Sequence, residues 1–205
     1  MTGNDQQPRS IVDRVKNILL QPAREWEVID GEAETIGGLY RRYIIPLAAI
    51  PAVAGLIGML AFGFSVMGFT YRPSVGSAVA SAVASAVVQY ATTLIGVFIL
   101  ALIIDALAPS FGATQNRVQA FKVAAYSGTA SWVAGIFAIL PALSWLSLLG
   151  LYGLYLLYLG LPRLMRAPQD KAMTYTILIV VAAIVVALVI GAITAPITAT
   201  FMRGF

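Results

Sequence analysis

Asp105 is the one acidic residue that lies inside a long apolar segment of this sequence, in the stretch LIIDALAPSFG. A carboxyl group in such a setting is costly unless it is paired or hydrated, so it is a functional candidate by default. It lies four residues before Pro109, near the end of the segment. Three roles are open for it: an ion or proton site, a docking point for a partner, or an interfacial carboxylate paired with Arg117, Lys122 or Arg163.

Hydroxyl and amide side chains in two of the apolar segments form a second group of candidates. The first segment carries Gln89, Tyr90, Thr92 and Thr93, and the second carries Tyr126, Ser127, Thr129 and Ser131. Such groups can hydrogen-bond between helices for about 0.6 kcal/mol each, which favours a structural role. A small polar cavity is the functional alternative, and Tyr126 and Ser127 are among the candidate functional residues.

The residues that most enzymes use are missing from this sequence. It has no cysteine and no histidine, which excludes thiol nucleophiles, disulfides, most zinc sites and a histidine-activated serine. There is no Walker loop, no zincin motif and no GxSxG motif. Intramembrane proteolysis would need two embedded aspartates, and the sequence supplies only one. We therefore predict no catalytic residue, no metal site and no cofactor.

Composition places the chain in the membrane class. Of its 205 residues 60% are hydrophobic and 11% are charged, whereas an ordinary globular domain has about 25% charged residues. The mean hydropathy is +0.86. The net charge is +4, but the basic residues flank apolar segments and form no continuous patch, so we predict no nucleic-acid partner.

The apolar segments predict an all-α fold, a polytopic membrane helix bundle. Residues 1–40 form a polar cytoplasmic head and residues 41–205 form the membrane domain. The domain is expected to cross the bilayer five times, at about 43–64, 79–107, 123–140, 144–161 and 174–199. The first of these spans extends roughly 33 Å as a helix, enough for a hydrocarbon core of roughly 30 Å.

The stretch from Val123 to Leu161 decides the topology, because it can be read as one crossing or two. Basic residues flank it on both sides: Arg117 and Lys122 before it, and Arg163, Arg166 and Lys171 after it. Both groups favour the same side of the membrane, so an even number of crossings must lie between them. We predict two short helices with a turn near Pro141, and a re-entrant hairpin is the alternative.

Charge asymmetry then predicts the orientation. With a cytoplasmic N-terminus and five spans, all but two of the thirteen Lys and Arg residues lie in the cytoplasm. The exceptions are Arg72 and Arg203. The C-terminus is therefore expected outside the cytoplasm.

The head contains an amphipathic helix in the stretch SIVDRVKNILLQP. Ser10 and Asp13 form a capping box, and Pro22 is expected to end the helix. At about 100° per residue, one face collects Ile11, Val12, Val15, Ile18 and Leu19. The other face collects Asp13, Arg14, Lys16 and Asn17. Such a helix is expected to lie in the membrane surface. The alternative is a helix that packs on the protein's own cytoplasmic face.

Several residues are expected to contact lipid. Trp26 suits an interfacial anchor, and four basic side chains are candidates for anionic headgroups: Arg14, Lys16, Arg166 and Lys171. Each charge near the surface is worth about 1 kcal/mol, and the basic loops on both sides of 123–161 are expected to contribute.

The repeat SAVASAVASAVV, residues 77–88, favours close helix packing within the chain or, alternatively, in a homo-oligomer.

Two stretches of the sequence resemble the Yip family of Ypt/Rab-interacting membrane proteins, and particularly its bacterial branch. They are NILLQPAREWEVIDGE in the head and AFKVAAYSGTASWVAGIFAILPALSWLSLLGLYGLYLLYLGLPRLMRAPQDKA in the middle. The resemblance covers about residues 15–200 and is most specific over 120–171. It implies a short polar head and five crossings and, for a bacterial chain, the cytoplasmic (inner) membrane.

The eukaryotic members of the family lie in endoplasmic reticulum and Golgi membranes, bind prenylated Rab GTPases and shape membranes. Here the head is only about forty residues, and Ala125-Tyr126-Ser127 stands where the family has Gly-Tyr-Ser. A GTPase partner is thus implied by family analogy only.

Two functions follow as hypotheses. The first is a non-catalytic protein that organises or shapes the bilayer or recruits a cytoplasmic partner. The second is a small transporter or channel, in dimeric form, with Asp105 as its ion or proton site.

Overall fold

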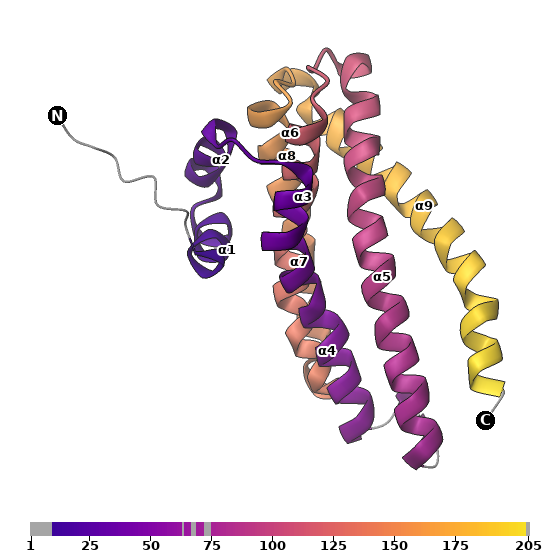
Figure 1. The fold of residues 1–205 in the computed structure, drawn as a ribbon. Coiled ribbons are helices and arrows are strands. Elements are labelled where there is room, and N and C mark those ends of the chain that lie inside the picture. Colours follow the sequence, from indigo (N-terminus) through magenta and orange to yellow (C-terminus); the bar gives the residue numbers. More distant parts are fainter. Residues whose placement is uncertain (1–9, 63, 67–68, 72–74, 204–205) are drawn as a thin grey trace.

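The computed structural model describes residues 10–62, 64–66, 69–71 and 75–203, and almost all of them are helical. Two short helices, α1 (Ile11–Leu20) and α2 (Pro22–Gly31), form a compact head. The head lies beside a bundle of longer helices (Figure 1). We call the upper end of the bundle in Figure 1, where α5 ends and α6 and α9 begin, the head end.

The first long helix has three parts that run as one: α3 (Ile36–Leu39), a π-helical turn η1 (Tyr40–Ile44) and α4 (Ile45–Phe62). It begins because the Thr35 side chain accepts a hydrogen bond from the backbone N–H of Gly38, at 3.0 Å. This helix starts earlier than the predicted span at residue 43. The wide turn ends two residues before Pro46, whose ring would clash with the carbonyl four residues before it in a regular helix.

A small antiparallel ribbon, β1 (Phe64–Val66) and β2 (Phe69–Tyr71), connects α4 to α5 (Val75–Leu107). Helix α5 contains the predicted span 79–107 and continues into a 3₁₀ turn, η2 (Ala108–Phe111). The turn is closed by Gly112, whose φ of 70° is in the left-handed region that glycine tolerates best. Arg72, predicted to lie outside the cytoplasm, is not among the described residues.

The middle of the chain forms a helical hairpin. Its first arm comprises α6 (Arg117–Ser127), α7 (Thr129–Ala134) and the 3₁₀ helix η3 (Gly135–Ile139). Its second arm comprises the 3₁₀ helix η4 (Pro141–Leu151) and α8 (Tyr152–Leu164). The chain reverses at an extended residue between the arms, next to Pro141.

The two arms of this hairpin approach closely at Gly153. A Cβ atom at this position would lie 2.6 Å from the carbonyl oxygen of Ser127, which is backbone and cannot move aside. Nearer to the turn of the hairpin, the Ser131 hydroxyl donates a hydrogen bond to the carbonyl of Gly150 at 3.1 Å. Small residues therefore set the distance between the arms, as they do between membrane helices generally.

Within the described residues, four helical segments are long and apolar enough to cross a membrane. They are Ile36–Phe62, Ala82–Phe111, Pro141–Leu164 and Gln169–Ala192. The predicted span 123–140 is not among them, because the hairpin's first arm is broken at Gly128. Helix α6 is moreover the centre of the bundle: Ala120 to Ser127 are all buried, against α5 on one side and α8 on the other.

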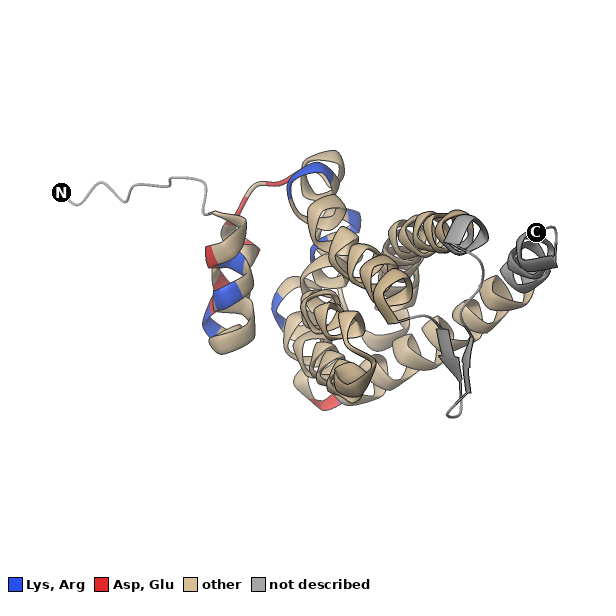
Figure 2. Cartoon of the chain, turned by 90° about the horizontal axis from the view of Figure 1, so that it is seen from below, with Lys and Arg blue, Asp and Glu red and all other residues tan. Residues whose placement is uncertain are grey.

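The last helix, α9 (Gln169–Arg203), is held at the head end and diverges from the bundle towards its C-terminus (Figure 1). Tyr175 fastens it there: its hydroxyl donates to the carbonyl of Ile104, and its ring stacks on Phe111 with centroids 4.8 Å apart. Charged residues gather on the head and the neighbouring helices, whereas the long helices are otherwise almost uncharged (Figure 2). The polar chemistry of the molecule is therefore concentrated at and beside the head.

Candidate functional site

The site is the junction where the head packs on the bundle, and it begins with the fold of α1. Ser10 caps this helix: its hydroxyl accepts the backbone N–H of Asp13 at 3.1 Å and donates to the Asp13 carboxylate at 2.7 Å. With its start defined in this way, α1 turns Ile18 and Arg14 towards the bundle. Ile18 is fully buried, and Arg14 is 7% exposed.

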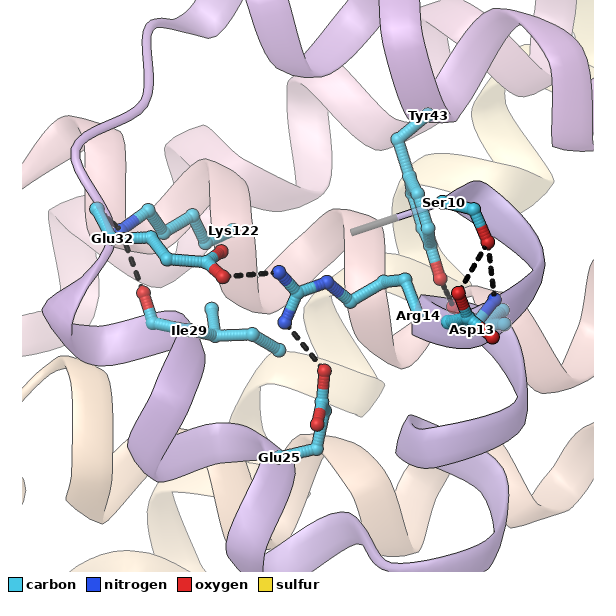
Figure 3. Close-up of polar contacts among 9 residues, drawn as sticks. Ser10, Asp13, Arg14, Glu25, Ile29, Glu32, Tyr43 and Lys122 are labelled. Carbon is cyan, nitrogen blue, oxygen red and sulfur yellow. Dashed lines mark hydrogen bonds and ion pairs between the residues drawn. The ribbon is translucent and has the colours of Figure 1, made fainter. Parts of the chain in front are cut away.

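Arg14 lies at the centre of a buried ionic network (Figure 3). Its Nη1 is 2.5 Å from a carboxylate oxygen of Glu25, and its Nη2 donates to the carboxylate of Glu32. Its guanidinium also lies over the ring of Tyr126, 5.6 Å from the centroid. Burial alone would disfavour its charge, but the hydrogen bond to Glu32 and the nearby carboxylates outweigh this, so the pKa of Arg14 is raised.

Lys122 reaches the same place from the bundle. Its buried ammonium group donates to the carbonyl of Ile29 at 2.9 Å and to the carbonyl of Glu32 at 2.6 Å (Figure 3). These carbonyls belong to the end of α2, where a helix has unpaired acceptors and a partial negative charge. Burial lowers the pKa of Lys122, and the charges of Glu32 and Asp30 oppose that fall. A lysine of α6 thus caps a helix of the head.

Aromatic rings form the apolar part of the junction. Trp26 is fully buried between α2 and α8, where a Cβ at Gly160 would lie 2.8 Å from its ring. Trp26 meets Tyr126 edge to face at 6.1 Å, and Tyr126 meets Tyr43 at 4.6 Å. The hydroxyl of Tyr43 hydrogen-bonds Thr129 at 2.7 Å. The head, η1 and the hairpin are therefore joined through one cluster of rings.

Exposed ion pairs surround this buried centre. Arg163 of α8 pairs with Glu27 at 3.1 Å, and Arg166 pairs with Asp30 at 2.8 Å. Gln119 also donates to Asp30, at 3.2 Å. Exposed pairs of this kind are worth about 0–1 kcal/mol each. They orient the head more than they stabilise it.

The junction brings together two of the five predicted functional residues, Lys122 and Tyr126, with Arg163 at its rim. Ser127 lies apart from it: the hydroxyl donates to the carbonyl of Ala124 at 3.2 Å, within its own helix. Asp105 also lies apart and faces Arg117, with Oδ2 at 3.9 Å from the guanidinium. Of the three basic residues considered as partners of Asp105, Arg117 is the one that pairs with it.

Two predictions of lipid contact are wrong. Trp26 was expected at the membrane interface and Arg14 at the headgroups, but both are buried within the protein. The reason is that the head folds back on the bundle, so the face of α1 with Arg14 meets protein. Conversely, Val12 is 70% exposed although it was assigned to the apolar face. Lys16 and Lys171 are exposed, as lipid contact requires.

Glu25 and Glu32 are the site residues that the sequence reasoning missed. They lie 11 and 18 positions from Arg14, so no helical spacing connects them to it. The one signal was an acidic cluster in EVIDGEAE, residues 27–34, which includes Glu32 but not Glu25 and lies opposite a basic face of α1. That cluster pairs with Arg14 of the head, with Arg163 of α8 and with Arg166 just after α8.

Two hollows flank α9, one of about 220 Å³ facing α5 and one of about 490 Å³ facing the hairpin. Apolar and small residues line both, with no charged side chain in either lining. The junction instead holds charges in fixed pairs. It can clamp two parts of the protein together, but it offers neither a nucleophile nor a general base aimed at an open space.

Comparison with known proteins assigns the chain. Residues 16–191 match the Yip1 domain family, a range that begins within α1, just after Arg14, and includes α2 and nearly all of the bundle. The chain belongs to the Yip1 family. This confirms the family predicted from the head and hairpin sequences, and with the four apolar segments it makes the protein an integral membrane protein.

Two curated relatives are similar to this Yip1-family protein: the inner membrane protein YohC of Escherichia coli strain K12, and the same-named protein of strain CFT073. Each is 26% identical over 133 residues, which cover 63% of this chain and 65% of the relative. The chain thus spans just under two thirds of their length. No solved structure matches it.

Proposed function

We propose that this Yip1-family protein is a non-catalytic membrane organiser, whose head holds a cytoplasmic protein at the bilayer. The observation that supports this most is the buried network of Arg14, Glu25 and Glu32 with Lys122 as a cap. A head fixed so firmly presents one constant surface beside the membrane. Its outer face, with Val12 and Leu20 at 70% and 69% exposure, is available to a partner.

The proposal includes a topology of five crossings, with the head cytoplasmic and the C-terminus outside. The four apolar segments supply four crossings, and the hairpin's first arm, whose α6 part is buried among its neighbours, supplies the fifth. Basic residues at the head end favour this orientation. The E. coli relatives are inner membrane proteins by name, so we assign the chain to a bacterial inner membrane.

Single cysteines test this topology cleanly, because the chain has none of its own. An impermeant maleimide should label Arg72→Cys, Ala142→Cys and Phe205→Cys from outside. It should label Asn116→Cys only after the membrane is opened. If Ala142→Cys is shielded from both sides, the hairpin is re-entrant and the five-span topology is incorrect. If Phe205→Cys reacts only from the cytoplasm, the orientation is incorrect.

Affinity capture from native membranes tests the recruiting role. The full chain should retain a cytoplasmic protein that Arg14→Ala loses to background, because that change releases the head. Arg24→Ala is the matched control: it removes one exposed arginine of α2 that has no ion-pair partner among the described residues, and it should retain the captured protein. Equal recovery by all three proteins would contradict the proposal. Ion flux in proteoliposomes that disappears with Asp105→Asn would instead support the transporter hypothesis.

A further inference from the structure

The basic residues whose side chains the structure describes fall into two groups, those paired within the described residues and those without such a partner. The paired ones are Arg14, Arg117, Lys122, Arg163 and Arg166. No carboxylate or carbonyl partner is found, within the described residues, for Lys16, Arg24, Arg41, Arg42 and Lys171. The loops expected to attract anionic lipid are thus largely occupied by the head.

Two of the free cations are adjacent in the chain and rigidly mounted. Arg41 and Arg42 are exposed residues of the π-helical turn η1. The tyrosines on either side are anchored in the bundle: the hydroxyl of Tyr40 donates to the carbonyl of Leu94 at 2.9 Å, and that of Tyr43 bonds Thr129. With both neighbours fixed inwards, the two guanidinium groups project outwards from a backbone of defined geometry.

Their position along the helix places them at the membrane surface. The 18 residues of α4 that follow η1 carry no charge and extend about 27 Å, close to the thickness of a hydrocarbon core. Arg41 and Arg42 therefore lie at the level of the headgroups on the head side. The anions concentrated at that level are the phosphates of phospholipids, and a guanidinium binds phosphate through two parallel hydrogen bonds.

We propose that Arg41 and Arg42 form a binding site for the phosphate of an anionic phospholipid in the leaflet next to the head. The inference rests on the proposed membrane role and specifies the lipid contact within it. The site differs from the loops around Arg117 and Arg163, where the sequence had placed such contacts. It binds lipid beside the head without using the head's own ion pairs.

The test measures which lipid stays with the full chain. Protein reconstituted in phosphatidylcholine bilayers with phosphatidylglycerol is extracted mildly, and bound phosphatidylglycerol is quantified per protein. The wild type should be enriched in phosphatidylglycerol. Removal of each arginine should weaken the enrichment about 5-fold, which corresponds to about 1 kcal/mol per charge near the surface. Arg41→Gln with Arg42→Gln should therefore lose most of it.

Arg163→Gln with Arg166→Gln is the matched control, because it removes the same charge from guanidinium groups that already have partners. It should retain the enrichment. Equal loss in both double variants, or no enrichment in the wild type, would overturn the proposal. Inorganic phosphate at matched ionic strength should not displace the lipid, and displacement would mean that the site takes free anions instead.

Head docking is read separately, from maleimide protection of a cysteine placed at buried Ile18. If the cysteine stays protected in the Arg41/Arg42 double variant, that variant is folded with its head docked. Any loss of bound lipid then results from removing the two arginines. If the wild type retains no cytoplasmic protein above background but shows normal lipid enrichment, the recruiting role is refuted and the lipid site stands.

Discussion

Replacing Arg14 with alanine is expected to release the head from the bundle. The change removes a cation that pairs with Glu25 in a place where the two side chains are 8% and 4% exposed. Breaking a buried pair by removing one partner typically costs about 3–5 kcal/mol, because the remaining charge stays desolvated. Glu32 is more exposed and contributes less to this cost. The head should therefore spend much of its time undocked.

The measurement is the rate at which a maleimide labels a cysteine at position 18, where Ile18 is fully buried in the native head. Labelling of the Ile18→Cys protein should be slow, and Arg14→Ala should accelerate it by two orders of magnitude or more, given about 1.4 kcal/mol per tenfold change. Arg24→Ala should leave it slow. Unchanged protection in Arg14→Ala would show that the ion network does not hold the head.

A second variant separates the charge from the packing. Arg14→Met combined with Glu25→Gln removes both charges and keeps much of the volume. Because replacing both partners of a buried pair is far less costly than removing one, docking should be largely recovered. If the head is still released in the double variant, the ion pair itself stabilises docking. The cost of Arg14→Ala would then not come only from leaving a buried charge without its partner.

Replacing Trp26 with alanine is expected to have an effect of similar size through a different cause. The indole is fully buried against Gly160 and the ring of Tyr126, so its removal leaves a large cavity between α2 and α8. Such truncations cost about 3–5 kcal/mol. Thermal denaturation of the full chain in detergent, together with labelling at position 18, should show a lower midpoint and a released head.

Trp26→Phe should cost much less than Trp26→Ala. The indole N–H is buried without a hydrogen-bond partner among the described residues, so phenylalanine loses volume but no hydrogen bond. Trp145→Ala is the control, because Trp145 is 64% exposed and its truncation should change stability by less than about 0.5 kcal/mol. A destabilisation by Trp145→Ala as large as by Trp26→Ala would mean that burial in the junction is not the cause.

The family, the membrane class and the helical architecture could be predicted because each rests on a local property of the chain. An uncharged run such as that of α4 or α9 is visible in the sequence itself, and its length alone decides whether it can cross a bilayer. The cap at Ser10 and the helix start at Pro141 are likewise decided within a few residues. The break at Gly128 was not foreseen, since a single glycine in an apolar run has no fixed effect.

Contacts between distant parts of the chain could not be predicted. Whether Arg14 meets lipid or Glu25 depends on the path by which the head returns to the bundle, and an amphipathic helix looks the same in either case. Trp26 has an anchor's chemistry, yet the space opened by Gly160, far along the sequence, makes it a core residue. Periodicity and charge thus determined which segments are helical and apolar. The tertiary structure alone decided which surface covers each polar side chain, because desolvation and pairing are properties of neighbours in space.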